Sequence, residues 1–157
     1  MKKLFDSFEK ECRKCFKFLE EEFAFKPPKR QRTHMSPSLT YQNDTTAVEV
    51  SLEPLDGGVF VLLSRLINGK IPEYPIFVTR EMTLHSYYLD DLVNLKMPDT
   101  PVRETSEDPL DEREVKKLLA QGAAQLRELG GDILRGDFSV FDKLDKIVKA
   151  RLPREKT

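Results

Sequence analysis

Apolar side chains recur at steps of three and four residues through the first 23 positions, which is the spacing of an amphipathic helix. Pro27 and Pro28 follow, and proline ends a helix because it has no N–H and restricts the residue before it. The pattern predicts a helix over residues 1–23 with an apolar stripe that must be covered. The stripe consists of Phe5, Phe8, Cys12, Cys15, Phe16, Leu19 and Phe23.

Between residues 38 and 79 the pattern changes to a period of two, which is typical of antiparallel strands with one face in water. The clearest alternation sets Val48, Val50 and Leu52 against Glu49, Ser51 and Glu53. Turn residues at 56–58 and 68–69 bound the apolar run 59–63, which predicts a central strand. Segment 74–79 follows Pro72 and contains Pro75, so it is expected to form an edge strand.

Helical spacing returns in residues 87–151. A short helix is expected over 87–96, followed by a Pro-rich acidic loop over 97–108. Asp108-Pro109 has the form of a helix N-cap, and Gly130-Gly131 should end or kink that helix. Ser139 and Asp142 have capping-box spacing, which predicts the start of a last helix.

These elements predict an α+β fold. It consists of a four-stranded antiparallel β-meander with an N-terminal helix and C-terminal helices packed mainly on one face. A length of 157 residues suits a single domain, 1–157, made of the helix 1–23, the sheet 38–79 and the helical part 87–151.

Charge narrows the function classes. The chain carries 26 Lys and Arg against 27 Asp and Glu, so it lacks the basic excess of most nucleic-acid-binding proteins. No apolar run is long enough to span a membrane, and acidic residues interrupt the start of the chain where a signal peptide would be apolar. With only two cysteines, the expected location is cytoplasmic, with no nucleic acid and no membrane as partner.

Candidate chemistry is sparse. Cys12 and Cys15 form a C-x-x-C pair, but both fit the apolar stripe, and His34 and His85 lack the spacing of zinc ligands. No catalytic, cofactor-binding or metal site is therefore assigned. The basic segment 26–32 has no interleaved aromatic residue for base stacking and is interpreted as a solvated connector.

The remaining candidate site is acidic. Four carboxylates in or next to the 97–108 loop lie where the chain also offers an edge strand, and acidic rims speed encounter with a basic partner. The loop is therefore expected to bind another protein. The four residues are Asp99, Glu104, Glu107 and Asp108.

Segment 133–141, Ile-Leu-Arg-Gly-Asp-Phe-Ser-Val-Phe, resembles the C-terminal end of small uncharacterised bacterial proteins, some of which resemble immunity proteins encoded beside polymorphic toxins. Tyr41-Gln42-Asn43 and Val48-Glu49-Val50 are also similar. The resemblance implies a bacterial, non-enzymatic α+β protein that neutralises a toxin. Two function classes stay open: a protein-binding module of this kind, and a small enzyme or ligand-binding domain with a cleft near His34 or His85.

Overall fold

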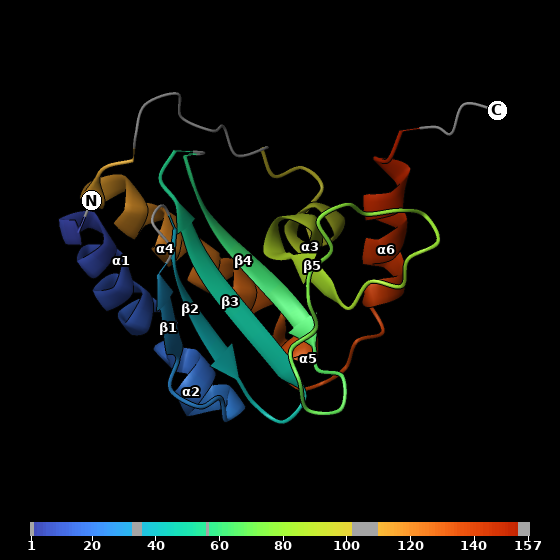
Figure 1. Cartoon of the computed structure of the whole chain (residues 1–157), viewed down its shortest axis with the longest axis horizontal. Helices are drawn as coiled ribbons and strands as arrows, with labels where there is room; N and C mark the ends of the chain where they lie inside the picture. Colours follow the sequence, from blue (N-terminus) through green and yellow to red (C-terminus); the bar gives the residue numbers. More distant parts are fainter. Residues whose placement is uncertain (1, 33–35, 56, 102–109, 154–157) are drawn as a thin grey trace.

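The structure is a computed structural model that describes residues 2–32, 36–55, 57–101 and 110–153. Five strands form one antiparallel sheet in the order β1-β2-β3-β4-β5 (Figure 1). Their bounds are β1 Lys29–Arg32, β2 Pro37–Gln42, β3 Thr46–Glu53, β4 Gly58–Arg65 and β5 Ser86–Tyr88. The helices are α1 Lys2–Cys15, α2 Lys17–Phe23, α3 Leu89–Lys96, α4 Glu112–Leu129, α5 Gly131–Leu134 and α6 Phe141–Ala150.

The predicted α+β class and the antiparallel sheet are confirmed, but the number of strands is five rather than four. Segment 74–79 is not a strand, so its prediction as the edge is wrong. The last strand is β5, which occupies residues predicted to begin a helix. It pairs with β4, and in the antiparallel register Tyr88 lies opposite Leu62, Tyr87 opposite Leu63 and Ser86 opposite Ser64.

The other unpredicted strand is β1, which lies in the segment interpreted as a connector. All four of its residues are exposed, so it has no apolar alternation that sequence could reveal. Besides its backbone pairing with β2, β1 is held by ion pairs with α1. Arg32 donates to both carboxylate oxygens of Glu9 on α1, at 2.8 and 2.6 Å, and to Asp6 at 2.6 Å. The basic N-terminal region is thus partly neutralised within the chain.

The N-terminal helix is not continuous, because it breaks at Phe16 between α1 and α2. Because of the break, Phe16 and Phe18 both point into the core, where their rings stack with centroids 6.2 Å apart. A straight helix would place these two side chains about 200° apart around its axis. Phe18 is off the predicted stripe and is nevertheless buried. The break therefore provides additional aromatic packing.

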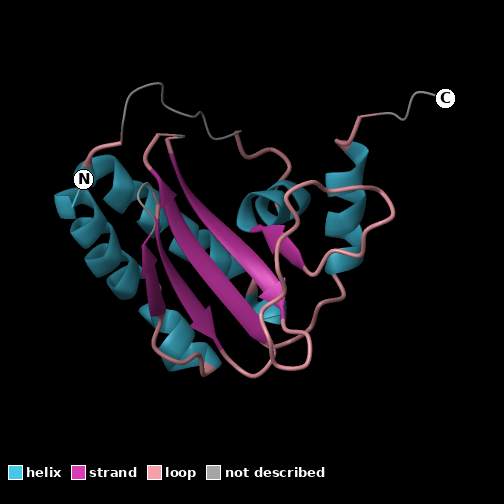
Figure 2. Cartoon of the chain, viewed as in Figure 1, coloured by secondary structure: helices cyan, strands magenta, loops and turns pink. Residues whose placement is uncertain are grey.

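One face of the sheet is covered by helices. In Figure 2, α4 crosses behind the central strands and α1 lies beside β1 and β2. The predicted inward residues of β3 are fully buried there, which confirms the assignment of its faces. From α4, Val115, Leu119, Ala123 and Leu126 pack into the same hydrophobic core.

Segment 133–141, which carries the resemblance, is hydrogen-bonded to the turn between β2 and β3. Asn43 Nδ2 donates to the backbone oxygens of Leu134 and Phe23, both at 3.1 Å. Thr46 Oγ1 donates to Ile133 O at 2.9 Å. Gly136 has φ +92°, and a Cβ there would lie 3.0 Å from Thr45. Segment 133–141 and the end of segment 41–43 therefore meet at one structural junction.

Two predicted helix starts differ from the structure. The last helix begins at Phe141, and no side chain caps its N-terminus. The predicted capping box is not formed, since the backbone N–H of Ser139 donates to Asp137 and not to Asp142. The Ser139 side chain, followed by this bond from Ser139 N at 3.0 Å, lowers the pKa of Asp137. Asp108-Pro109 lies outside the described residues. Asp111 is the N-cap of α4 and accepts from Glu114 N at 2.8 Å.

Candidate protein-binding face

The second face of the sheet carries no helix among the described residues (Figure 1). Directly opposed residues of antiparallel strands point to the same side, so the register defines this face. Thr40, Glu49, Leu62 and Tyr88 form one row across four strands, and Ser51 lies opposite Phe60 in the next row. We call these six residues the open face: Thr40, Glu49, Ser51, Phe60, Leu62 and Tyr88.

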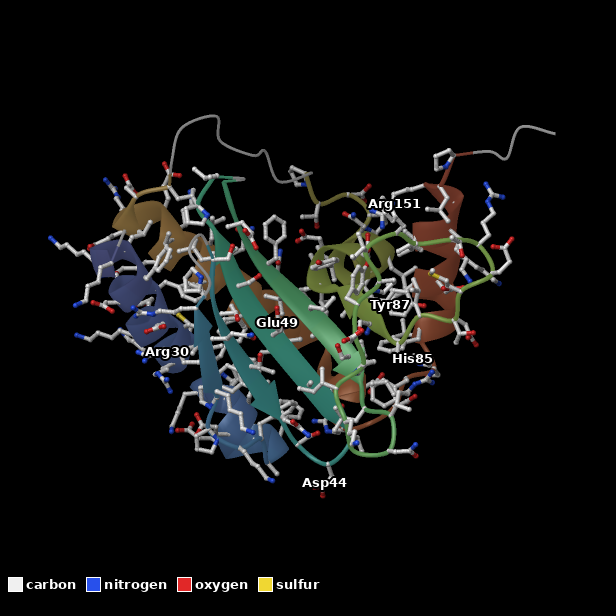
Figure 3. All side chains as sticks on the ribbon, viewed as in Figure 1. Arg30, Asp44, Glu49, His85, Tyr87 and Arg151 are labelled. Carbon is white, nitrogen blue, oxygen red and sulfur yellow. The ribbon has the colours of Figure 1, made fainter. Side chains whose placement is uncertain are left out.

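Glu49 lies near the middle of the open face (Figure 3). It is half-buried, and burial followed by the charge of Glu53 raises its pKa. Among the described residues it has no hydrogen-bond or ion-pair partner. Glu53, by contrast, accepts a hydrogen bond from Ser36 Oγ at 2.6 Å. The central carboxylate of the open face is therefore partly desolvated and uncompensated.

Aromatic rings flank this carboxylate on the β4–β5 side. Tyr88 makes edge contacts with Phe60 and Tyr74, with ring centroids 6.3 and 5.6 Å apart. Burial raises the pKa of the Tyr88 phenol, and the nearby Tyr74 and Glu49 raise it further. The open face thus combines apolar rings and phenol hydroxyls with an unpaired carboxylate. Tyrosine in such settings is common at the centres of protein interfaces.

Residues 66–85, which we call the rim loop, connect β4 to β5 and pass beside α6 (Figure 1). Within this loop, Ile76 is 92% exposed and Phe77 is 80% exposed. The loop is nevertheless braced: Lys149 Nζ donates to Met82 O at 2.8 Å, and Tyr74 packs on Tyr88. Two neighbouring large apolar side chains are therefore held in water on a supported loop.

The four tyrosines of the chain divide between the two faces of the sheet. Tyr41 and Tyr87 are core residues, whereas Tyr74 and Tyr88 lie by the open face. The Tyr87 hydroxyl donates to Asp145 on α6 at 2.9 Å. Strand period alone separates Tyr87 from Tyr88 once both are placed in a strand. The helix predicted over 87–96 is present but begins at Leu89, so its predicted start concealed this signal.

Of the four residues of the predicted acidic site, one lies in the described part of the chain. Asp99 is exposed in the turn after α3. Glu104, Glu107 and Asp108 lie outside the described residues, so their grouping with Asp99 stays a prediction. Glu49 and Phe77 were not predicted as site residues. Whether a helix covers them decides if they are exposed to a partner, and the residue pattern of a single strand does not specify that.

The histidines were the alternative candidates. His34 lies outside the described residues, and His85 borders a pocket of about 210 Å³ with Tyr74, Met82 and Ser86. An Arg65 Nη lies 2.9 Å from His85 Nδ1, and arginine only donates, so Nδ1 accepts. The Ser86 and Ser64 hydroxyls are hydrogen-bonded to each other at 2.7 Å. The pocket has room for a small molecule, but it presents no nucleophile paired with a base among the described residues.

The C-x-x-C pair lies on α1. Cys12 is fully buried, as predicted, and burial raises the pKa of its thiol. Cys15 is half-buried, with its sulfur 3.8 Å from Glu11 Oε1, so the prediction of a buried thiol holds only in part for it. Within the described residues, no group of three or more His, Cys, Asp or Glu side chains could hold a metal ion.

Comparison with models of protein families, with curated protein sequences and with solved structures finds no match. None of the helices in the described part of the chain has the length and apolarity needed to cross a membrane. The chemistry of the surface itself therefore carries the functional argument.

Proposed function

We propose that this protein is a non-enzymatic protein-binding module whose binding surface is the open face together with Ile76 and Phe77 of the rim loop. The observation that carries the proposal is the exposure of Ile76 and Phe77, at 92% and 80%, on a loop braced beside a sheet face without helices. Large exposed apolar side chains on a supported loop are typical of binding anchors, because little side-chain order is lost on association.

The open face supports a partner of defined charge. Glu49 is half-buried without a compensating group among the described residues, so a partner cation placed beside it would regain part of the lost solvation energy. Tyr88 and Phe60 provide apolar contact next to it. The preferred partner is a protein that offers a lysine or arginine within an apolar surface.

Toxin neutralisation is the narrower form of this proposal. It rests on the resemblance of the C-terminal segment to small bacterial proteins, some of which resemble immunity proteins, and an acidic centre suits a basic nuclease surface. The acidic residues predicted from sequence would then speed encounter, while Glu49 and Phe77 would hold the complex. Asp99 is the described member of that group.

The experiment starts with a photo-crosslinking amino acid at Phe77 and, as a control, at Lys146, which is exposed on α6. The partner crosslinked only from position 77 is then purified for binding kinetics. Phe77→Ser and Glu49→Lys should each weaken binding by about 2 kcal/mol, mainly through faster dissociation. Asp99→Lys should slow association and reduce its salt dependence.

Lys146→Glu is the matched control and should leave the affinity unchanged. If Phe77→Ser and Glu49→Lys both bind the partner as the unmodified protein does, the open face is not the binding surface. An effect confined to Asp99→Lys would assign recognition to the acidic turn instead.

A further inference from the structure

We infer that the free edge of β1 binds an extended acidic segment of another protein, which adds to the sheet as a sixth strand. This inference goes beyond the open face and rests on β1 and the residues just before it; the two surfaces share Thr40. It begins with the two edges of the sheet. At one edge, β5 has only three residues, and its Tyr87 is bonded to α6 through Asp145. At the other edge, β1 pairs with β2 alone among the described strands.

The edge is presented in a fixed position. Arg32 is bonded to Glu9 and Asp6 of α1, and Lys26 N donates to Gln42 O at 2.9 Å just before the strand begins. These bonds hold both ends of β1 while all four of its residues stay exposed. A strand edge offers backbone N–H and C=O groups to an added strand, and a held edge loses little order on pairing.

A groove of about 560 Å³ lies over β1 and β2 on the side of the sheet that carries Thr40, and we call it the lysine groove. Lys26 and Lys29 border it and have no ion-pair partner among the described residues, whereas Arg30 lies 3.8 Å from Glu9. Uncompensated positive charge therefore lies on β1 and in the residues just before it. Further lining residues are Gln31, Thr40, Gln42 and Ile71.

This charge selects among possible occupants. A second copy pairing β1 against β1 would place Lys29, Arg30 and Arg32 opposite like charges, which destabilises strand pairs. Single-stranded nucleic acid usually requires aromatic side chains for base stacking, and the groove lining contains none. An extended polypeptide with alternate carboxylates matches both the backbone edge and the lysines.

The test uses three peptides: acetyl-Glu-Val-Glu-Val-Glu-Val-amide, its lysine counterpart, and the acidic peptide N-methylated at alternate amides. Residue-resolved NMR titration and amide hydrogen exchange of the whole protein report where each one binds. The acidic peptide should shift and protect the amides of residues 29–32. The lysine peptide should bind about tenfold more weakly or worse, and N-methylation should abolish binding because it removes the ladder hydrogen bonds.

Matched variants distinguish this site from the open face. The double variant Lys26→Glu/Lys29→Glu should weaken the acidic peptide about tenfold, whereas Lys143→Glu/Lys146→Glu on α6 makes the same charge change and should have no effect. Phe77→Ser should also leave peptide binding unchanged, so failure of one proposal does not imply failure of the other. Equal affinity of the N-methylated peptide, shifts centred outside β1, or tighter binding of an oligothymidine at the same residues would each overturn strand addition.

Discussion

The two faces of this sheet are built from alternate residues of the same strands but have opposite environments. On β3, Val48, Val50 and Leu52 are completely buried under helices, whereas Glu49 and Ser51 on the open face are only half-buried. The helix-covered side, which we call the closed face, buries these aliphatic residues together with Tyr41 and Tyr87 and explains why the chain folds. The open face keeps a carboxylate and aromatic rings where no helix covers them. Under the proposed function, stability and recognition would lie on opposite sides of one sheet.

The largest expected effect is a charge on the closed face. Val50→Asp should lower the free energy of unfolding by about 3–5 kcal/mol, because it removes packed methyl groups and buries an unpaired carboxylate. Ser51→Asp, one residue away on the open face, should cost less than about 1 kcal/mol. Urea unfolding followed by circular dichroism measures both. Equal costs for the two variants would mean that the faces are not different.

The next effect concerns the junction that joins the sheet to its C-terminal helices. Gly136→Ala should cost about 2–3 kcal/mol, because φ is +92° and the new Cβ would lie 3.0 Å from Thr45. Gly69→Ala is the matched control: φ is +75°, but no atom lies within 4 Å of its Cβ position. It should cost about 1 kcal/mol. Thermal unfolding compares them, and similar values would show that contact with Thr45 contributes nothing.

These residues also explain how much the sequence could predict. Strict alternation placed Val48, Val50 and Leu52 correctly, because the period of a strand is a local property. Strand β1 escaped prediction because Arg32 is held by Glu9, 23 positions away, and no local pattern encodes that pairing. Tyr88 escaped because β5 has three residues, too few to establish a period. The open face was therefore predicted only at β3, and its boundaries come from distant contacts.

A smaller effect should follow from loosening β1. Glu9→Gln weakens a bidentate ion pair with Arg32, with atoms 2.8 and 2.6 Å apart, and should cost about 1 kcal/mol because the arginine is partly exposed. Amide exchange of residues 29–32 should accelerate more than that of β3. Glu20→Gln is the control, since its 3.4 Å pair with Lys17 lies on one helix and should be worth less than about 0.5 kcal/mol. Unchanged exchange in β1 would mean that other contacts hold the strand.

The smallest effect tests the open face directly through pH. Burial, followed by the charge of Glu53, raises the pKa of Glu49 above its ordinary value. A carboxyl group whose pKa is higher in the folded state destabilises that state when ionised. The cost is present above the raised folded pKa and disappears as pH falls through it towards the ordinary, unfolded value. Glu49→Gln should therefore stabilise the protein at neutral pH, by less than about 0.5 kcal/mol, and the gain should vanish in acid.

Urea unfolding of Glu49→Gln at a series of pH values, with Glu128→Gln on the exposed side of α4 as the control for removing one charge, measures this difference. The control should show no comparable gain, because Glu128 is in water in both states. Destabilisation of Glu49→Gln at neutral pH would mean that the carboxylate already has a stabilising partner within the fold. The centre of the open face would then be compensated, and the reason for expecting a cationic group from a binding partner would be lost.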